Sequence, residues 1–216
     1  EAKRADALLV HYSTDYVFDG TKTTAYTEED EPNPLNVYGK TKLAGEQAIR
    51  STCPRHLIFR TSWVYGLRGR NFLLTILRLA KEKEELRVVN DQRGAPTWCR
   101  RIALATAEIL NGPAILNLDN DCFFGLYNLV AGGSCTWFEF AQGILAASGE
   151  KALENTRVIP IRTEDYPTPV KRPPDSRLDC AKAIKAFGIE LPDWKDDLHL
   201  AAKGDSPAGD LRHNGK

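Results

Sequence analysis

The sequence lacks several features that mark particular classes of protein. Its five cysteines are odd in number and widely spaced, with no C-x-x-C pair and no cluster with histidine, so neither a disulfide framework nor a zinc site is expected. Lys plus Arg equals Asp plus Glu at 29 each, and without a basic excess nucleic acid is not expected as a partner. We therefore expect no metal and no nucleic-acid-binding function.

Long apolar runs are also absent. No run approaches the roughly 18 apolar residues that a membrane-spanning helix needs, and the charged start EAKRAD does not have the pattern of a signal peptide. Unpaired cysteines fit a reducing compartment. We therefore expect a cytoplasmic protein with no membrane partner.

The overall composition is that of a folded protein. A length of 216 residues permits a buried core and suggests one domain or two small ones. Hydrophobic residues make up 42% and charged residues 27%, far from the low hydrophobicity and high charge of disordered chains. The chain is expected to fold.

Strand-like and helix-like segments alternate along the chain. Apolar runs rich in strand formers predict strands over residues 7–13, 56–61, 86–89, 125–130 and 157–161. Helical spacing and capping residues predict helices over residues 36–51, 71–84 and 137–147, and another that ends near Gly112. Four prolines between Thr163 and Pro174 predict a loop there. This alternation predicts β-α-β units and an α/β fold.

Tyr38 and Lys42 form a pair that can carry chemistry. Four residues apart in a predicted helix, they lie on one face. Reduction of a carbonyl by a nicotinamide needs a proton donor at the oxygen, and a free tyrosine, with a pKa of about 10, donates poorly at neutral pH. Lowering the tyrosine pKa to near 7 takes roughly 4 kcal/mol, at 1.36 kcal/mol per pKa unit. A cation about 4 Å away supplies roughly this much at an effective dielectric of 20. A chance pair on a solvated helix is the alternative.

Ser13, Thr14 and Asp15 end the first predicted strand. In open α/β sheets, binding and catalytic sites gather at the carboxyl ends of the strands. A hydroxyl at this position can hydrogen-bond a substrate carbonyl or the tyrosine. The context therefore favours a site over a surface pair.

Six segments carry a resemblance to a known family. In order along the chain, they are STDYVFDG (13–20), PLNVYGKTKLAGE (34–46), RTSWVYG (60–66), DQRGAPT (91–97), GLYNLVAGGSCTWFEFA (125–141) and YPTPVKRPPDSRLDC (166–180). Together they resemble the dTDP-4-dehydrorhamnose reductases of the extended short-chain dehydrogenase/reductase family. The resemblance spans roughly Ala7 to Leu198, and several collinear motifs make it specific.

The resemblance implies an oxidoreductase of cell-surface polysaccharide biosynthesis. It would reduce the C4 keto group of dTDP-4-dehydro-L-rhamnose to dTDP-L-rhamnose with NADPH or NADH. Tyr38 would be the general acid, Lys42 would hold the nicotinamide ribose and make the phenol more acidic, and Thr14 would tune it. Ser13 would join Tyr38 and Lys42 in binding the cofactor.

The resemblance also implies the residues that bind the dTDP-sugar. Thr14, Asp15 and Trp63 would contact the sugar or its nucleotide, and Arg172 would take the diphosphate with its planar fork. The alternatives are a core tryptophan for Trp63 and a surface arginine for Arg172. A homodimer stays open.

The DQRGAPT segment (91–97) allows two interpretations. The resemblance suggests a loop on the substrate side that includes Gln92. The residues alone favour a tight turn in which Gly94 supplies a positive φ and Pro96 supplies stiffness.

One departure from the family is the lack of a glycine-rich turn before the tyrosine motif. The family begins with a strand, a Gly-x-x-Gly-x-x-Gly turn and a helix that receives the cofactor pyrophosphate. We therefore expect an N-terminally truncated chain that binds nicotinamide poorly and turns over little by itself.

The resemblance to the reductase family implies a division of the chain into two parts and a tail. Residues 1–90 would be the remainder of an NAD(P)-binding Rossmann domain, the C-terminal part of a doubly wound parallel sheet, with the Tyr/Lys helix. Residues 91–202 would mainly form a small α/β substrate-binding region, with strands that can interleave with the first, and residues 203–216 would be a disordered tail.

Two other functions stay open. One is a non-catalytic regulatory subunit, because the methionine adenosyltransferase β subunit shares similar STDYVFDG and YGKTK segments. Retained Thr14, Tyr38, Lys42 and Trp63 argue against it, since a binding module needs no acid. The other is a nucleotide-sugar epimerase or dehydratase on the same scaffold, which the mass of the product would separate from a reductase.

Overall fold

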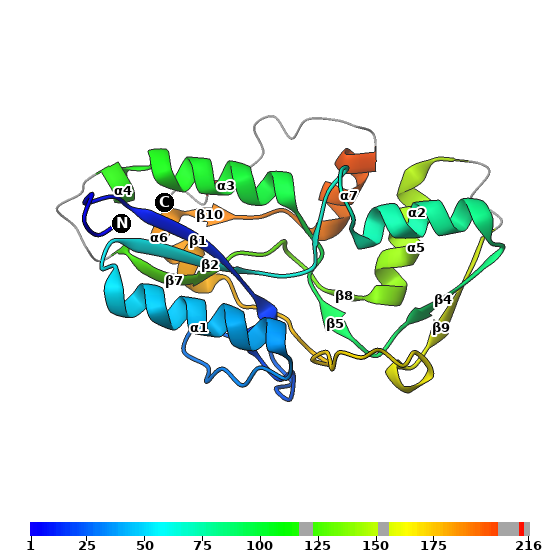
Figure 1. The fold of residues 1–216 in the computed structure, drawn as a ribbon. Helices are drawn as coiled ribbons and strands as arrows, with labels where there is room; N and C mark the ends of the chain where they lie inside the picture. Colours follow the sequence, from blue (N-terminus) through cyan, green and yellow to red (C-terminus); the bar gives the residue numbers. More distant parts are fainter. Residues whose placement is uncertain (117–122, 151–155, 203–211, 214–216) are drawn as a thin grey trace.

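A parallel three-stranded sheet, in the order β1-β2-β7, forms the core of one unit of the molecule (Figure 1). The computed structural model describes residues 1–116, 123–150, 156–202 and the backbone of 212–213. The strands are β1 (Leu9–Thr14), β2 (His56–Thr61) and β7 (Gly125–Asn128). All of β2 is buried, as expected of a central strand covered on both faces. In the described part of the chain, β1 is an edge strand.

Helices cover both faces of this sheet (Figure 1). They are α1 (Val37–Thr52), α3 (Cys99–Asn111), α4 (Pro113–Leu116) and α6 (Ala181–Phe187). Leu57 and Phe59 of β2 pack with apolar residues of α3 and α6. Arg60, which points the other way because side chains alternate along a strand, bonds to Glu46 of α1. The sheet thus lies between α1 and the α3 and α6 pair.

A second unit contains, in the residues that the structure describes, three helices and one parallel strand pair, β4 with β9 (Figure 1). Its elements are α2 (Phe72–Glu82), β4 (Glu85–Val89), α5 (Trp137–Ser148), β9 (Arg157–Ile161) and α7 (Trp194–Ala202). Phe140 of α5 and Trp194 of α7 lie in its core with apolar residues of α2 and β4. No helix in the described ranges is long and apolar enough to cross a membrane.

Two short strand pairs lie where the chain passes between the units. They are β3 (Val64–Tyr65) with β6 (Thr97–Trp98), and β5 (Arg93–Gly94) with β8 (Cys135–Thr136). The units interleave in sequence, because α2 and β4 of the second precede α3 and β7 of the first. Short 3-10 helices follow two strands: η1 (Asp15–Val17) after β1 and η4 (Thr163–Asp165) after β9.

The predicted strands and helices are confirmed to within a few residues. α1 begins after Asn36, whose side chain accepts a hydrogen bond from the backbone nitrogen of Gly39 at 2.8 Å, as an N-cap does. The predicted tail, residues 203–216, lies outside the described residues except for β11 (Arg212–His213). That strand pairs antiparallel with β10 (Ile189–Glu190), so these two residues differ from a disordered tail.

Candidate active site

The end of β1 carries three of the predicted site residues into the interior. The Thr14 hydroxyl accepts a hydrogen bond from the backbone nitrogen of Tyr16 at 3.2 Å and donates one to Oδ1 of Asp15 at 3.1 Å. Ser13 Oγ is buried without a hydrogen-bond partner in the part of the chain that the structure describes. Thr14 thereby ends β1 and starts η1.

Burial changes the acidity of Asp15. Its side chain is only 2% exposed. This burial raises the pKa of the carboxyl from 3.8 to about 6, and the hydrogen bond from the Thr14 hydroxyl limits the rise. The carboxyl is therefore held in its neutral form in mildly acidic solution.

The first turn of α1 lies directly against η1. A Cβ at Gly39 would lie 2.1 Å from the carbonyl oxygen of Tyr16 and 2.9 Å from Cβ of Pro34, so only glycine fits there. The Tyr16 ring contacts the Tyr38 ring edge-on, with their centroids 6.0 Å apart. This close approach sets Tyr38 beside the end of β1.

Tyr38 is accessible, whereas Lys42 is anchored to β1. The Tyr38 side chain is 54% exposed and lines a cavity. Nζ of Lys42 donates a hydrogen bond to the backbone carbonyl of Tyr12 and lies 3.4 Å from Nε2 of His11. Among the described residues no hydrogen bond joins Tyr38 to Lys42. The Tyr38 phenol is therefore open to a ligand, which a proton donor at a binding site has to be.

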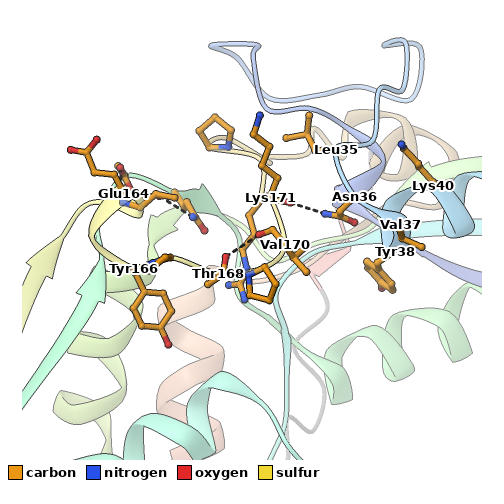
Figure 2. Close-up of a pocket in the computed structure, with 17 residues that line it drawn as sticks. Leu35, Asn36, Val37, Tyr38, Lys40, Glu164, Tyr166, Thr168, Val170 and Lys171 are labelled. Carbon is orange, nitrogen blue, oxygen red and sulfur yellow. Dashed lines mark hydrogen bonds between the residues drawn. The ribbon is translucent and has the colours of Figure 1, made fainter.

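The cavity beside Tyr38 has a volume of about 890 Å³. Asn36, Val37 and Tyr38 of α1 and its cap lie on one side, and Glu164 and Tyr166 lie on the other (Figure 2). The loop of residues 163–174, here called the proline loop, supplies most of the remaining wall. A smaller cavity of about 220 Å³ shares four of its residues: Gln92, Tyr166, Thr168 and Arg172. The two cavities therefore adjoin each other at these four residues.

The proline loop is fixed to the end of β4. Asp91 accepts hydrogen bonds from the backbone nitrogen of Thr163 at 3.0 Å and from its hydroxyl at 2.6 Å. Gln92 Nε2 donates to the same hydroxyl at 2.9 Å. At the other end of the loop, the Asn36 amide donates to the carbonyl of Lys171 at 2.9 Å. The DQRGAPT segment thus supports the cavity wall.

Trp63 lies outside both cavities and packs between two segments. Its ring stacks on Trp137 with the centroids 3.5 Å apart and the planes 5° apart. A Cβ at Gly94 would lie 2.4 Å from Cε2 of Trp63. The prediction that Gly94 supplies a positive φ is wrong, because its φ is not positive; the residue is glycine because the indole lies against its backbone.

The structure thus separates the predicted site residues into two groups. Tyr38 and Arg172 line the large cavity. The other five, which do not line it, are Ser13, Thr14, Asp15, Lys42 and Trp63.

A buried ion pair fixes α1 and was not predicted from the sequence. Arg60 of β2 donates to both carboxylate oxygens of Glu46 at 2.9 and 2.7 Å, and both side chains are 1% exposed. The Arg60 guanidinium also lies 5.0 Å from the centre of the Phe18 ring. A charged residue inside an apolar strand was the available signal, since buried arginine needs a partner.

A parallel sheet with hydroxyls at the end of a strand, and a Tyr-x-x-x-Lys helix beside it, define a Rossmann-like protein of the short-chain dehydrogenase/reductase class. The chain belongs to the dTDP-4-dehydrorhamnose reductase family, and the family model described as RmlD substrate binding domain matches residues 1–205. This confirms the resemblance and the Rossmann-like fold expected from the sequence.

Two curated relatives and one solved structure give the extent of the similarity. The dTDP-4-dehydrorhamnose reductase of Burkholderia thailandensis is 47% identical over 93% of this chain and 69% of its own length. That of Salmonella typhimurium is 47% identical over 90% of this chain and 64% of its own. The Bacillus anthracis enzyme, solved in complex with NADP, has a TM-score of 0.83 at 34% identity, covering 94% of this chain and 68% of that one. The chain spans about two thirds of the length of these relatives.

Proposed function

We propose that this chain forms the catalytic and sugar-nucleotide-binding part of a reductase. The enzyme reduces the C4 keto group of dTDP-4-dehydro-L-rhamnose to dTDP-L-rhamnose with NADPH or NADH. Membership of the reductase family supports this proposal. The observation that carries it is the accessible Tyr38 phenol at the edge of the cavity, one helical turn before an anchored lysine.

The residues around Lys42 fit a nicotinamide riboside. An ammonium has three N–H donors, and Lys42 donates one of them to the backbone carbonyl of Tyr12 in β1. A ribose hydroxyl can accept another. A bound nicotinamide supplies the hydride, and the relative from Bacillus anthracis was solved with NADP.

Tyr38 is the proton donor on this proposal. As the C4 oxygen gains negative charge, the phenol gives it a proton, and the nearby ammonium of Lys42 stabilises the phenolate that results. The Thr14 hydroxyl already donates to Asp15 and accepts from Tyr16. These two bonds fix the Thr14 hydroxyl at the end of β1, and its contacts with the phenol or with the sugar stay predictions.

Cationic side chains at the cavity suit a diphosphate. Arg172, Lys171 and Lys40 line it, and a guanidinium binds phosphate oxygens in a bidentate manner. With the diphosphate at Arg172, the sugar would extend toward Tyr38. Contacts of the sugar or nucleotide with Trp63 and Asp15, and of the cofactor with Ser13, stay predictions.

The two units would then have separate roles. The unit built on β1-β2-β7 would be the remainder of the NAD(P)-binding domain, and the unit of α2, β4, α5, β9 and α7 would bind the substrate. The cavity is lined by α1 from the first and by the proline loop that follows β9 of the second. A cytoplasmic location and a homodimer belong to the same proposal.

Replacing Tyr38 with phenylalanine tests the proposal. In the full gene product, Tyr38→Phe is expected to lower kcat by about 10²–10⁴-fold, because the proton donor is lost. KM for the dTDP-sugar should change little, since the ring remains. Oxidation of NADPH followed by absorbance gives both parameters. A variant as active as the parent protein, or a parent protein with no reductase activity, would refute the proposal.

A further inference from the structure

His11 occupies a position that the proposed mechanism has not used. It lies in the middle of β1, and its Nε2 atom is 3.4 Å from Nζ of Lys42. A Cβ added at Gly45, on the next turn of α1, would lie 3.8 Å from the same nitrogen. The imidazole is therefore situated between β1 and α1, directly beside the functional ammonium.

We propose that His11 is a positioning residue, whose neutral imidazole accepts a hydrogen bond from Lys42 and so aims the remaining N–H of that lysine at the cofactor ribose. This inference rests on the proposed function, because it assumes that Lys42 binds a nicotinamide. A lysine side chain is long and flexible, and one hydrogen bond to the Tyr12 carbonyl leaves its ammonium free to rotate. A second acceptor from the same strand fixes the direction of the third donor. Such contacts are often long without a ligand and shorten when one binds.

The surroundings of His11 favour the neutral form of its imidazole. Burial lowers the pKa of the imidazole, the Lys42 ammonium lowers it further, and Glu46 opposes them. Glu46 is bound on both oxygens by Arg60, which reduces its effect. The neighbouring Tyr12 phenol is hydrogen-bonded to Thr106 at 2.8 Å.

The direction of the pH dependence follows from this arrangement. The proton of neutral His11 must be on Nδ1, because Nε2 is the acceptor. As the pH falls through the lowered pKa, the ring gains a charge, loses its acceptor and repels Lys42. Cofactor affinity should therefore be lost on the acid side.

The first arm of the test needs no enzyme activity. The ring protons of His11 are titrated by NMR in this chain, and His11→Gln assigns the signal. In Lys42→Met, the pKa of His11 should rise, because a neighbouring cation is gone. Lys40→Met removes a cation that faces the cavity instead and should leave it unchanged. Identical titration of His11 in the parent chain and in Lys42→Met would overturn the pairing.

The second arm measures kinetics on the full gene product. His11→Leu should raise KM for NADPH about tenfold, the usual effect of losing one hydrogen bond to a charged group, with less effect on kcat. His11→Gln, whose amide oxygen can replace Nε2, should restore most of the affinity and lose the decline on the acid side. His199→Leu, at an exposed site on α7, is the matched control.

The outcomes separate the two proposals. A KM for NADPH in His11→Leu equal to that of the parent protein would overturn the role of His11. So would a His11→Gln variant whose KM is raised as much as that of His11→Leu and whose affinity still declines on the acid side. Thermal unfolding of each variant shows whether it is folded. If His11→Leu does not fold, the NMR titration decides whether His11 and Lys42 are paired. A parent protein that reduces no ketone would instead refute the proposed function, whereas the NMR result would still stand.

Discussion

At the residue scale, the end of β1 holds side chains with different access to a ligand. Asp15 is 2% exposed, whereas Tyr38 beside it is 54% exposed. The Thr14 hydroxyl is hydrogen-bonded to both the Asp15 carboxyl and the backbone nitrogen of Tyr16. The buried carboxyl thus orients a hydroxyl rather than facing the cavity.

Asp15 makes the stability of the chain depend on pH. Its pKa is raised from 3.8 to about 6, so the folded state keeps a proton that the unfolded state has lost over this range. Stability should therefore fall as the pH rises from about 4 to about 6, by up to roughly 3 kcal/mol at 1.36 kcal/mol per pH unit.

Asp15→Asn should remove this contribution, because the amide has nearly the same shape and no charge. Urea unfolding at pH values on both sides of this window measures the difference. The variant should gain stability relative to the parent chain at neutral pH and not at pH 4. The same pH profile in both proteins would contradict the raised pKa.

At the element scale, α1 is fixed by a backbone contact at its start and an ion pair near its middle. Gly39 lets the helix approach η1, and Glu46 ties it to Arg60 of β2. Removal of one partner from such a buried pair costs about 3–5 kcal/mol, because the other charge is left unpaired. The direction of Tyr38 and Lys42 depends on both attachments.

Substitution of two glycines in α1 tests this dependence. Gly39→Ala should destabilise the chain by about 1–3 kcal/mol, as overpacking does, because the new Cβ would lie 2.1 Å from a backbone oxygen. Gly45→Ala meets only His11 at 3.8 Å and should be neutral or stabilising, since alanine favours helix. Urea unfolding compares the two. Equal stability of both variants would refute the close approach.

Local sequence patterns predicted these elements well. The Asn36 cap and the helical spacing after it were sufficient for α1, because capping and periodicity act within a few residues. The Glu46–Arg60 pair could not be found in this way, because it joins a helix to a strand. The prediction of a positive φ at Gly94 was wrong for a similar reason. Gly94 packs against Trp63, which is distant in sequence.

At the scale of the whole molecule, the candidate site depends on contacts between segments that lie far apart in sequence. Tyr38 and Lys42 were predicted from one helix, but the wall of the cavity beside Tyr38 is held by hydrogen bonds of Asp91 with Thr163 and of Asn36 with Lys171. These pairs are 72 and 135 residues apart in sequence. Tertiary contacts of this kind have no local pattern, so the cavity could not be derived from the sequence.

The most direct test of the account follows the hydride. The full gene product is incubated with the dTDP-4-dehydro-sugar and with NADPH that carries deuterium at the transferred position. Analysis of the product by mass and NMR should find deuterium on carbon 4 of the sugar, in a reaction that Tyr38→Phe nearly abolishes. An unlabelled product of unchanged mass, or a labelled product formed equally well by Tyr38→Phe, would contradict the role assigned to Tyr38.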